Sequence, residues 1–513
     1  MKHVSDRLHP RTLEALPKTV ARYAYPREKL KTGIVHLGLG AFVRAHMAAI
    51  NEVTLHAHFD LRWGIVGVSL RQPDTRDALL EQDGLYTLSL RHTSASGEAR
   101  QQLQVIGCLS QVLVAPEDPG KVIRLIAAVD TRIVSLTVTE KGYCHNPAQG
   151  TLQWDHPDIV QDLDHTQTPR SAIGFIVRGL QQRYLTHGLP LTLMSLDNLP
   201  SNGHLLSRLV LDFAQKIDPA LAQWIEARCT FPNSMVDRIV PRTTEADRTN
   251  IDATLGLRDA WPVIAETFNQ WIIEDKFVLE RPAWALGGAQ FVESAAAWET
   301  LKLRMVNGTH SAIAYLGSLA GWLTVDQAMS QPELVAFLDA LMCEEIEPTL
   351  PELPSLDLAA YRQSLLVRFT NRALAHRTQQ IAMDGSQKIP QRWLNTIRYC
   401  QTHQRLYPKL ALGLAAWIQY LGGTDAFGNK YKIQDPLANV LQATLRHAEA
   451  AVLKGTDQTP THLAHQQVQA LIGLQQIFSD LKDDADLITA VAQQLVSLRT
   501  RGVVQTLSTH LPR

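Results

Sequence analysis

The sequence predicts an α/β domain built on a parallel sheet, followed by a mostly α-helical domain. Two observations support this prediction. Between residue 33 and about residue 293, short runs rich in Val, Ile, Leu and Thr alternate with longer helical stretches, which is typical of a parallel sheet covered by helices. Beyond residue 294 such runs nearly vanish, and apolar residues recur at helical spacing. We therefore expect two domains, residues 1–293 and 294–513.

The clearest strand candidates of the first domain are short and continuously apolar. Buried parallel strands have this composition, because helices cover both of their faces. The candidates are GIVHLGLG (33–40), WGIVGVSL (63–70), RIVSLTVTE (132–140) and LTLMSLDN (191–198). In the second domain, the acidic and Pro-rich segment EEIEPTLPELPSLDL (344–358) is expected to be an exposed connection.

Length, charge and cysteine content exclude several classes of protein. At 513 residues and 45% hydrophobic composition, the chain can bury the cores of two or three domains. A formal net charge of -1 provides no long-range field that would attract nucleic acid or an anionic membrane surface. The five cysteines are odd in number and far apart, which argues against a disulfide framework and against clustered thiolate metal ligands. Because no apolar run resembles an export signal or a membrane span, we expect a cytoplasmic protein, and we expect no metal.

A glycine turn follows the first strand candidate. In VHLGLGAF, Gly38 would permit a tight turn, and Gly40 would let the backbone approach a pyrophosphate. The segment RAHMAAINEV (44–53) would then form a helix whose amino terminus favours negative charge. Val43 stands where the usual fingerprint has its third glycine, so an ordinary strand-to-helix turn is the alternative.

An acidic residue follows the second strand candidate. Asp74 could accept hydrogen bonds from the ribose hydroxyls of a dinucleotide, and a solvated loop aspartate is the alternative. The first domain is thus predicted to be of the Rossmann type. Its candidate cofactor-binding residues are Gly38, Gly40, Ala41, Phe42, Arg44 and Asp74.

Polar residues share one side of a predicted helix near the start of the second domain. On a helix with about 100° per residue, Glu299 lies at about 60° and His310 at about 80° from Lys302. Asn307 lies at about 140°. Gly308, which costs about 1 kcal/mol in a helix relative to alanine, indicates close approach by another group. Together these side chains could bind one small substrate, and a hydrated helix face is the alternative.

These residue types fit the removal of a hydride from a carbinol. A lysine can accept the hydroxyl proton where burial or its neighbours favour the neutral amine. Asparagine amides can hold the developing oxyanion, and Asn198, at the end of the fourth strand candidate, could pair with Asn307. A turn asparagine is the alternative for Asn198. Zinc-assisted oxidation is not supported, because no Cys/His cluster has zinc-ligand spacing. A Tyr-x-x-x-Lys match at Tyr25 and Lys29 precedes the first strand and is treated as chance.

At these motifs the chain resembles the polyol-specific long-chain dehydrogenases, the family of mannitol 2-dehydrogenase, fructuronate reductase and tagaturonate reductase. The resemblance extends over nearly the whole chain. It rests on the stretches IVHLGLGAFVRAH, IVSLTVTEKGYC, SLDNLPSNG, FPNSMVDRIVP, FNQWIIEDKFV, RPAW, KLRMVNGTH and AMDGSQKIPQR.

The resemblance implies roles for particular residues. Lys302 would be the general acid/base, and Asn307 and Asn198 would be the oxyanion donors. The remaining implied site residues are His310, which would orient substrate hydroxyls, Asp237, which would tune the lysine, and Glu299, which would connect it to solvent.

The resemblance favours the hexuronate branch of the family. That branch shares TEKGYC (139–144) and QIAMDGSQK (380–388), whereas the stretch 242–262 is closer to the mannitol branch. Lys141, Arg304 and Lys388 are therefore candidates to bind a substrate carboxylate. We expect NAD as cofactor and the interconversion of D-mannonate and D-fructuronate, with a mannitol 2-dehydrogenase acting on D-mannitol as the alternative.

The same residues bear on the expected partner and on other functions. The expected partner is a small sugar acid or polyol rather than nucleic acid or a membrane, and the oligomeric state stays open. A nucleotide-binding protein without catalysis is a third hypothesis. The intact set of Lys302, Asn307 and His310 argues against it.

Overall fold

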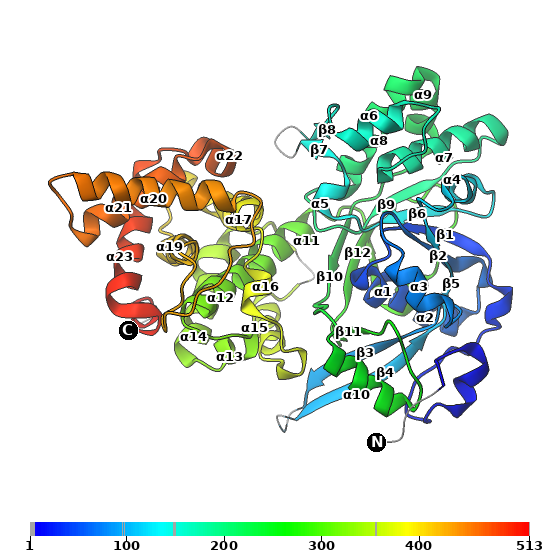
Figure 1. Cartoon of the computed structure of the whole chain (residues 1–513), viewed down its shortest axis with the longest axis horizontal. Coiled ribbons are helices and arrows are strands. Elements are labelled where there is room, and N and C mark those ends of the chain that lie inside the picture. The colour runs from blue at the N-terminus through cyan, green and yellow to red at the C-terminus, as the bar shows by residue number, and fades with distance from the viewer. Residues whose placement is uncertain (1–5, 95, 97, 147–149, 354–355, 512–513) are drawn as a thin grey trace. The chain divides into compact units, whose positions relative to one another are not determined.

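Five parallel strands form the central sheet of the first part of the chain (Figure 1). The computed structural model describes residues 6–94, 96, 98–146, 150–353 and 356–511, and it divides into two compact units, Met1–Glu299 and Thr300–Arg513. The sheet has the order β5-β2-β1-β6-β9. Its strands are β1 (Thr32–Leu37), β2 (Gly64–Ser69), β5 (Leu109–Val114), β6 (Ile133–Leu136) and β9 (Thr192–Ser195). The strand order reverses between β1 and β6, as in Rossmann-type folds, which confirms the predicted fold class of the first domain.

Apolar side chains on both faces of the sheet explain its burial. Successive side chains of a strand point to opposite faces. In β1, Val35 belongs to the core shared with helices α4, α7 and α8, whereas Ile34 belongs to the core shared with α2. The helices of this unit are α1 (Ala41–Ala45), α2 (Met47–His58), α3 (Asp74–Leu80), α4 (Pro119–Ala127), α5 (Thr139–Gly142), α6 (Pro157–Leu163), α7 (Ala172–Thr186), α8 (Asn202–Ile217), α9 (Pro219–Arg228) and α10 (Glu245–Leu255).

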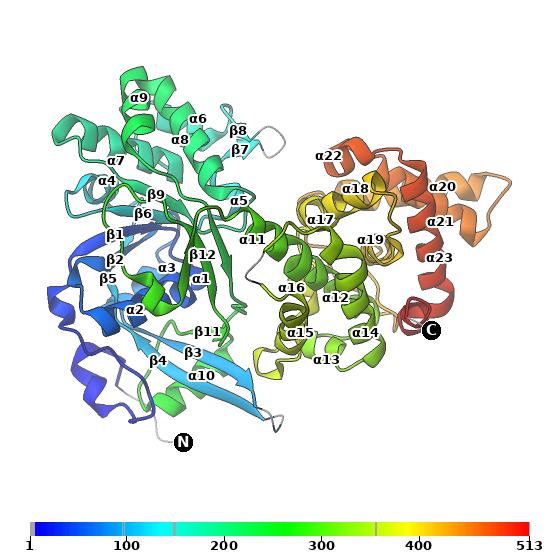
Figure 2. The ribbon, with the colours of Figure 1, turned by 180° about the vertical axis from the view of Figure 1, so that it is seen from behind.

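Smaller sheets extend the first unit (Figure 2). Two are three-stranded, with the orders β11-β3-β4 and β10-β12-β13, and one is the hairpin β7-β8. Their strands are β3 (Tyr86–Thr93), β4 (Ala99–Ile106), β7 (His145–Asn146), β8 (Thr151–Leu152), β10 (Ser234–Asp237), β11 (Val263–Glu266), β12 (Gln270–Glu274) and β13 (Ala289–Val292).

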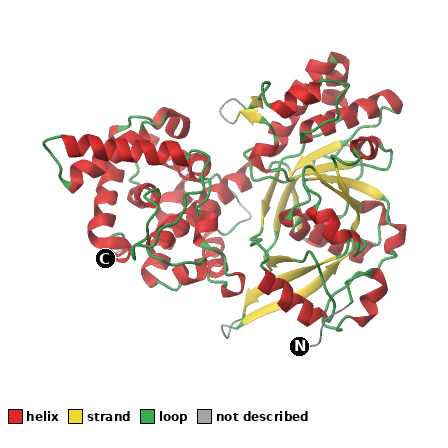
Figure 3. Cartoon of the chain, viewed as in Figure 1, coloured by secondary structure: helices red, strands yellow, loops and turns green. Residues whose placement is uncertain are grey.

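The second unit consists of helices and connecting loops in its described residues (Figure 3). Its centre is α12 (Gly308–Leu319), in which every residue is buried. A helix buried on all sides must pack against neighbours around its whole circumference. The other helices are α11 (Ala296–Leu301, across the division), α13 (Val325–Met329), α14 (Pro332–Ala340), α15 (Leu358–Phe369), α16 (Thr378–Ile381), α17 (Gly385–Ile389), α18 (Asn395–Thr402), α19 (Pro408–Tyr420), α20 (Ala438–Lys454), α21 (Pro460–Ile472), α22 (Gln475–Phe478) and α23 (Ala485–Ser508).

The expected domain boundary after Glu293 and the observed division after Glu299 differ by residues 294–299, which include the first residues of α11. None of the helices in the described part of the chain combines the length and hydropathy that a bilayer span requires.

Three local predictions are corrected by the structure. The strand expected over 132–140 ends at Leu136, and the helical turn α5 follows, because the N–H groups of Val138 and Thr139 donate to the Asp197 carboxylate instead of continuing the sheet. The helix expected over 44–53 is broken at His46, where φ is -112° and ψ is -88°.

The third correction concerns part of the acidic segment expected to be exposed, in which Glu344, Pro351, Glu352 and Asp357 are exposed but Glu345 is not. Residues Leu341–Ile346 form a π-helical turn in which Glu345 is 2% exposed. The Glu345 carboxylate accepts hydrogen bonds from the backbone N–H groups of Lys409 and Leu410 at the start of α19. Glu345 is therefore buried because its carboxylate caps the amino terminus of α19. Residues 354 and 355 of the same segment lie outside the described residues.

We predict that Gly38→Ala will destabilise the protein much more than Gly188→Ala. Both glycines have a positive φ, +92° at Gly38 and +63° at Gly188, so alanine at either site carries about 1–2 kcal/mol of backbone strain. A Cβ at Gly38 would lie 2.1 Å from the carbonyl oxygen of Thr137, whereas at Gly188 it would meet nothing within 4 Å. Urea unfolding should show a loss of at least about 3 kcal/mol for Gly38→Ala. Equal losses for the two variants would contradict the close approach at Gly38.

Candidate active site

A cavity of about 370 Å³ lies at the carboxyl ends of β1, β2 and β6. This is where the strand order reverses, and ligands of open α/β sheets bind at such a point. The cavity is formed by the turns after the three strands and by the start of α7. Its lining residues include Gly38, Gly40, Arg71, Asp74, Thr137 and Arg170.

Two glycines bring backbone to the edge of this cavity. The Gly38 carbonyl accepts hydrogen bonds from the Thr137 hydroxyl at 2.8 Å and from the Gly40 N–H at 2.7 Å, which holds the turn closed. A Cβ at Gly40 would meet only the Gly38 carbonyl oxygen, at 3.9 Å. The space beside Gly40 is therefore open, and a ligand can approach the backbone there.

Of the other predicted cofactor residues, some are exposed and some are buried. Asp74 is exposed at the start of α3 and lines the cavity. Phe42 stacks on His46, with ring centroids 5.0 Å apart, and Ala41 is the exposed first residue of α1. Arg44 is buried and donates to the carbonyl groups of Gly40 and Trp261, at 3.2 and 2.6 Å. Arg44 thus supports the wall of the cavity from behind.

The Asp197 carboxylate joins the ends of β6 and β9. It accepts hydrogen bonds from the N–H groups of Val138 and Thr139, both at 3.0 Å, and from the Tyr143 hydroxyl at 2.9 Å. Burial raises the pKa of Asp197, and these donors oppose that effect. The network fixes the backbone next to Asn198, and it also fixes α5, which carries the exposed Lys141.

In the second unit, Lys302 begins a π-helical turn, Lys302–Asn307, between α11 and α12. Lys302 is 5% exposed. A π-helix joins residues i and i+5, so it holds more residues per turn than an α-helix. The predicted regular helix is therefore corrected. Asn307 follows Lys302 by five positions, the spacing that a π-helix joins, so the angle of about 140° expected for a regular helix does not apply.

Another π-helical turn, Pro390–Leu394, packs against Lys302–Asn307. Arg392 donates to the Asn307 carbonyl at 3.2 Å and to the Ser311 hydroxyl at 2.8 Å. The Trp393 indole N–H donates to the Gly308 carbonyl at 3.1 Å. A Cβ at Gly308 would lie 3.3 Å from the Arg392 carbonyl oxygen, so the close approach predicted from this glycine is present. These contacts therefore stabilise the irregular backbone of both π-helical turns, Lys302–Asn307 and Pro390–Leu394.

Positive and neutral nitrogen groups gather around this turn. Burial lowers the pKa of Arg392 to about 10 and that of Lys388 to about 8, and Arg392 adds to the effect on Lys388. Burial also lowers the pKa of His310 well below its ordinary value, with further contributions from His376 and nearby cations. The His310 ring lies 4.4 Å from the Phe369 ring, and its Nε2 has no hydrogen-bond partner among the described residues. A neutral imidazole with an unused nitrogen is suited to bind a hydroxyl group.

Three further predicted residues have definite places. Arg304 donates to the Thr349 carbonyl at 2.6 Å, which gives no support to a role in substrate binding. The Glu299 carboxylate accepts the Ser201 N–H at 2.9 and 3.0 Å within the first unit. Asp237 is the buried last residue of β10.

Comparison with known proteins identifies the family. The profile of the mannitol dehydrogenase Rossmann domain matches residues 32–286, and that of the mannitol dehydrogenase C-terminal domain matches residues 295–499. The chain belongs to the mannitol dehydrogenase family. The predictions of an oxidoreductase of this family, and of its fold class, are confirmed.

Relatives with different substrate names are similar to this chain. The D-mannonate oxidoreductase of Escherichia coli is 41% identical over 489 residues, which cover 94% of this chain and 96% of that protein. Mannitol dehydrogenase 2 of Saccharomyces cerevisiae is 38% identical over 502 residues, which cover 97% of this chain and 96% of that protein. A solved ternary complex of Pseudomonas fluorescens mannitol 2-dehydrogenase with NAD and D-mannitol is 36% identical, with a TM-score of 0.88 and coverage of 98% of this chain and 99% of that chain.

Sequence reasoning missed several residues that shape the candidate site of this mannitol dehydrogenase family member. Arg170 lines the cavity, Asp197 orders its rim, and Arg392 and His376 surround the π-helical turn. Asp197 and Arg392 stand inside the motifs SLDN and SQKIPQR, which were the available signal. The contacts they make could not be read from those motifs.

We predict that acidification will destabilise the protein partly through His376. Burial, with Lys388 nearby, lowers the pKa of His376 to about 4. The unfolded chain therefore takes up a proton below about pH 6.5, while the folded chain does not, so stability falls as pH drops through this window. At about pH 5 this histidine should account for up to about 2 kcal/mol of lost stability. Urea unfolding of His376→Asn at about pH 7.5 and about pH 5 should show a smaller acid loss than wild type.

The matched control is His447→Asn, which replaces an exposed histidine on α20. It should keep the acid dependence of the wild type. If His376→Asn loses as much stability on acidification as wild type does, His376 is not held neutral in the folded chain.

Proposed function

We propose that this chain is an NAD-dependent dehydrogenase that interconverts D-mannonate and D-fructuronate, with Lys302 as general acid/base. The observation that carries the proposal is the environment of Lys302. It is buried on a π-helical turn, and the neutral His310 and the cations Lys388 and Arg392 belong to the same unit. Burial favours the neutral form of an amine, which is the form that accepts a proton.

The cavity of the first unit fits a dinucleotide. Gly40 leaves the backbone accessible to a ligand at the edge of the cavity. Gly38 allows the turn to pack closely against Thr137, with which a side chain at this position would collide. Asp74 would bond a free ribose hydroxyl and repel a 2′-phosphate, which favours NAD over NADP. Arg71 also lines the cavity, but its guanidinium bonds the Asp158 carboxylate at 2.5 Å and is partly neutralised there. NAD is the dinucleotide in the related Pseudomonas fluorescens complex. When bound, it accepts the hydride.

The residues of the chain supply proton transfer and orientation. As the substrate C–H bond gives up its hydride, Lys302 takes the proton of the hydroxyl on the same carbon. The Asn307 amide donates to the oxygen on which charge develops, and Asn198 is proposed as the second donor on the sequence resemblance. Neutral amide donors stabilise the oxyanion without competing for the proton. His310 would hold a neighbouring substrate hydroxyl through its Nε2.

A carboxylate on the substrate is supported by the positive charge of the second unit. Among the described residues no carboxylate forms an ion pair with Arg392, and Lys388 bonds only a backbone carbonyl, that of Ile381 at 3.3 Å. A substrate carboxylate would compensate these desolvated cations. Lys141, exposed on α5 in the first unit, remains a second candidate for this contact.

The alternative function is mannitol 2-dehydrogenase activity. It is favoured by the Pseudomonas fluorescens complex, which holds D-mannitol and covers nearly the whole chain. The presence or absence of a carboxylate on the preferred substrate distinguishes the two functions.

We predict that Lys302→Ala will lower kcat by about 10²–10⁴-fold while the dissociation constant for NAD changes little. The reason is that the lysine acts on the proton in the transition state and not on the dinucleotide. Steady-state kinetics and fluorescence titration with NADH measure the two quantities. Small added amines should restore part of the activity. Lys454→Ala, at an exposed lysine of α20, is the control and should behave as wild type. Retention of more than about a tenth of wild-type turnover would rule out Lys302 as the base.

We predict that wild type will oxidise D-mannonate with a higher kcat/KM than D-mannitol. A charge-assisted hydrogen bond to the carboxylate contributes about 1.5–3 kcal/mol, which corresponds to about 10–100-fold in kcat/KM. Lys388→Gln should reduce the value for D-mannonate by about that factor and change that for D-mannitol much less. The same measurements on Lys141→Gly test the second candidate contact. If D-mannitol is oxidised as efficiently as D-mannonate, the mannitol function replaces the proposed one.

A further inference from the structure

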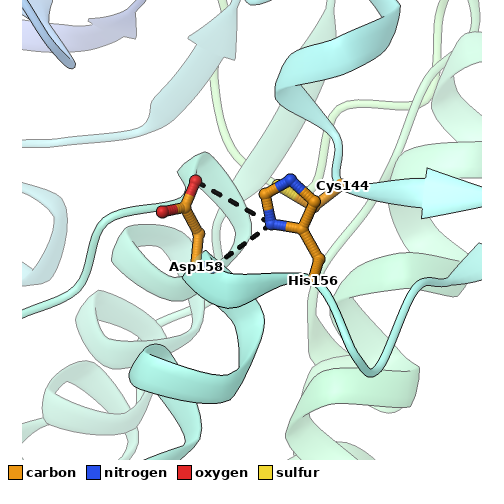
Figure 4. Close-up of side chains that lie close together, drawn as sticks. All are labelled: Cys144, His156 and Asp158. Carbon is orange, nitrogen blue, oxygen red and sulfur yellow. Dashed lines mark hydrogen bonds and ion pairs between the residues drawn. The ribbon is translucent and has the colours of Figure 1, made fainter.

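Three potential metal ligands meet in the first unit, outside the proposed active site. They are Cys144, His156 and Asp158, and their ligand atoms all lie within 4.8 Å of one another (Figure 4). From this geometry we propose that Cys144, His156 and Asp158 form a binding site for a single zinc-like divalent cation. The proposal is independent of the substrate of the enzyme.

The fold brings these residues together by a hairpin. Cys144 directly precedes β7, and the chain returns through β8 to His156, the residue before α6. The Gln153 N–H donates to the Cys144 carbonyl at 3.0 Å, and the His156 N–H donates to the Gln153 carbonyl at 3.0 Å. The His156 Nδ1, which lies 3.9 Å from the Asp158 carboxylate, accepts the N–H of Asp158 at 3.2 Å, and a bound cation would take the place of this hydrogen bond. These hydrogen bonds fix the backbone that carries Cys144 and His156.

The donor set selects the class of cation. A thiolate, an imidazole and a carboxylate together suit Zn²⁺, which binds sulfur, nitrogen and oxygen donors in tetrahedral sites. Three protein ligands leave one position for water. Cys144 is 4% exposed and Asp158 is 9% exposed, so the ligands are shielded, while His156 keeps the site in contact with solvent. Mg²⁺ prefers oxygen ligands in an octahedral arrangement and does not fit this set.

One cation already contacts the cluster. The Arg71 guanidinium bonds the Asp158 carboxylate at 2.5 Å, and Arg71 also lines the cavity at the end of β2. Its positive charge opposes a second cation at Asp158. Zinc binding therefore competes electrostatically with Arg71, and removal of this side chain should tighten zinc binding.

The test measures zinc binding to the purified full chain after treatment with a chelator. Equilibrium dialysis with a zinc salt, followed by elemental analysis, should find a single zinc ion per chain in wild type. Cys144→Ser and His156→Gln should each weaken zinc binding by more than about tenfold. Cys343→Ser, which removes the exposed free cysteine, is the matched control and should bind zinc as wild type does. With cobalt in place of zinc, wild type should show a thiolate-to-metal charge-transfer band that is absent in Cys144→Ser.

Arg71→Ala tests the competition and should bind zinc more tightly than wild type. Circular dichroism of each variant verifies folding, and His156→Gln keeps the site testable if Cys144→Ser does not fold. The proposal fails if zinc does not bind in a fixed ratio, if both ligand variants retain wild-type affinity, or if the cobalt complex lacks the thiolate band. Magnesium should not displace zinc. Displacement of zinc by magnesium would contradict the proposal, because it would indicate a site made of oxygen ligands only.

Discussion

The hydrogen bonds of Arg392 hold the backbone that carries the proposed general base. Its guanidinium donates to the Asn307 carbonyl and to the Ser311 hydroxyl, on either side of the end of the π-helical turn. Hydrogen bonds from a charged donor contribute about 1.5–3 kcal/mol each. The backbone at the end of the turn Lys302–Asn307 is therefore stabilised by a residue far away in the sequence.

In the first unit a single carboxylate has a comparable role. The Asp197 carboxylate accepts hydrogen bonds from the N–H groups of Val138 and Thr139, which follow β6. The chain therefore leaves the sheet at this point and begins α5. Thr139 adopts a positive φ of 61° at this place. Because Thr137 and Val138 line the cavity, the network at Asp197 also shapes the rim of the proposed dinucleotide site. In both units the candidate site residues thus lie on irregular backbone. A charged side chain stabilises that backbone by hydrogen bonds, Asp197 in the first unit and Arg392 in the second.

The sequence predicted regular structure well and irregular structure poorly. Strands such as β1 and β2 were evident because their apolar residues are continuous. The glycine turn was evident because Gly38 permits the positive φ of a tight turn and Gly40 leaves space for a ligand. The break at His46 was not evident from the sequence, because the residues that follow it, MAAINEV, are compatible with a helix whether or not the helix begins before His46. The π-helical turn has the same residue types as an α-helix, so its wider winding leaves no periodic signal. The contacts of Arg392, and the meeting of Cys144 with Asp158, depend on tertiary packing that residue spacing does not reveal.

Among the described residues, those that line the cavity at the ends of the strands belong to the first unit, and the cations Lys388 and Arg392 belong to the second. On the proposed function, substitutions around the turn would change the preference for the carbohydrate, and substitutions around the cavity would change the preference for the dinucleotide. Lys141 and Asn198 are the exceptions, because they belong to the first unit and are proposed to contact the substrate.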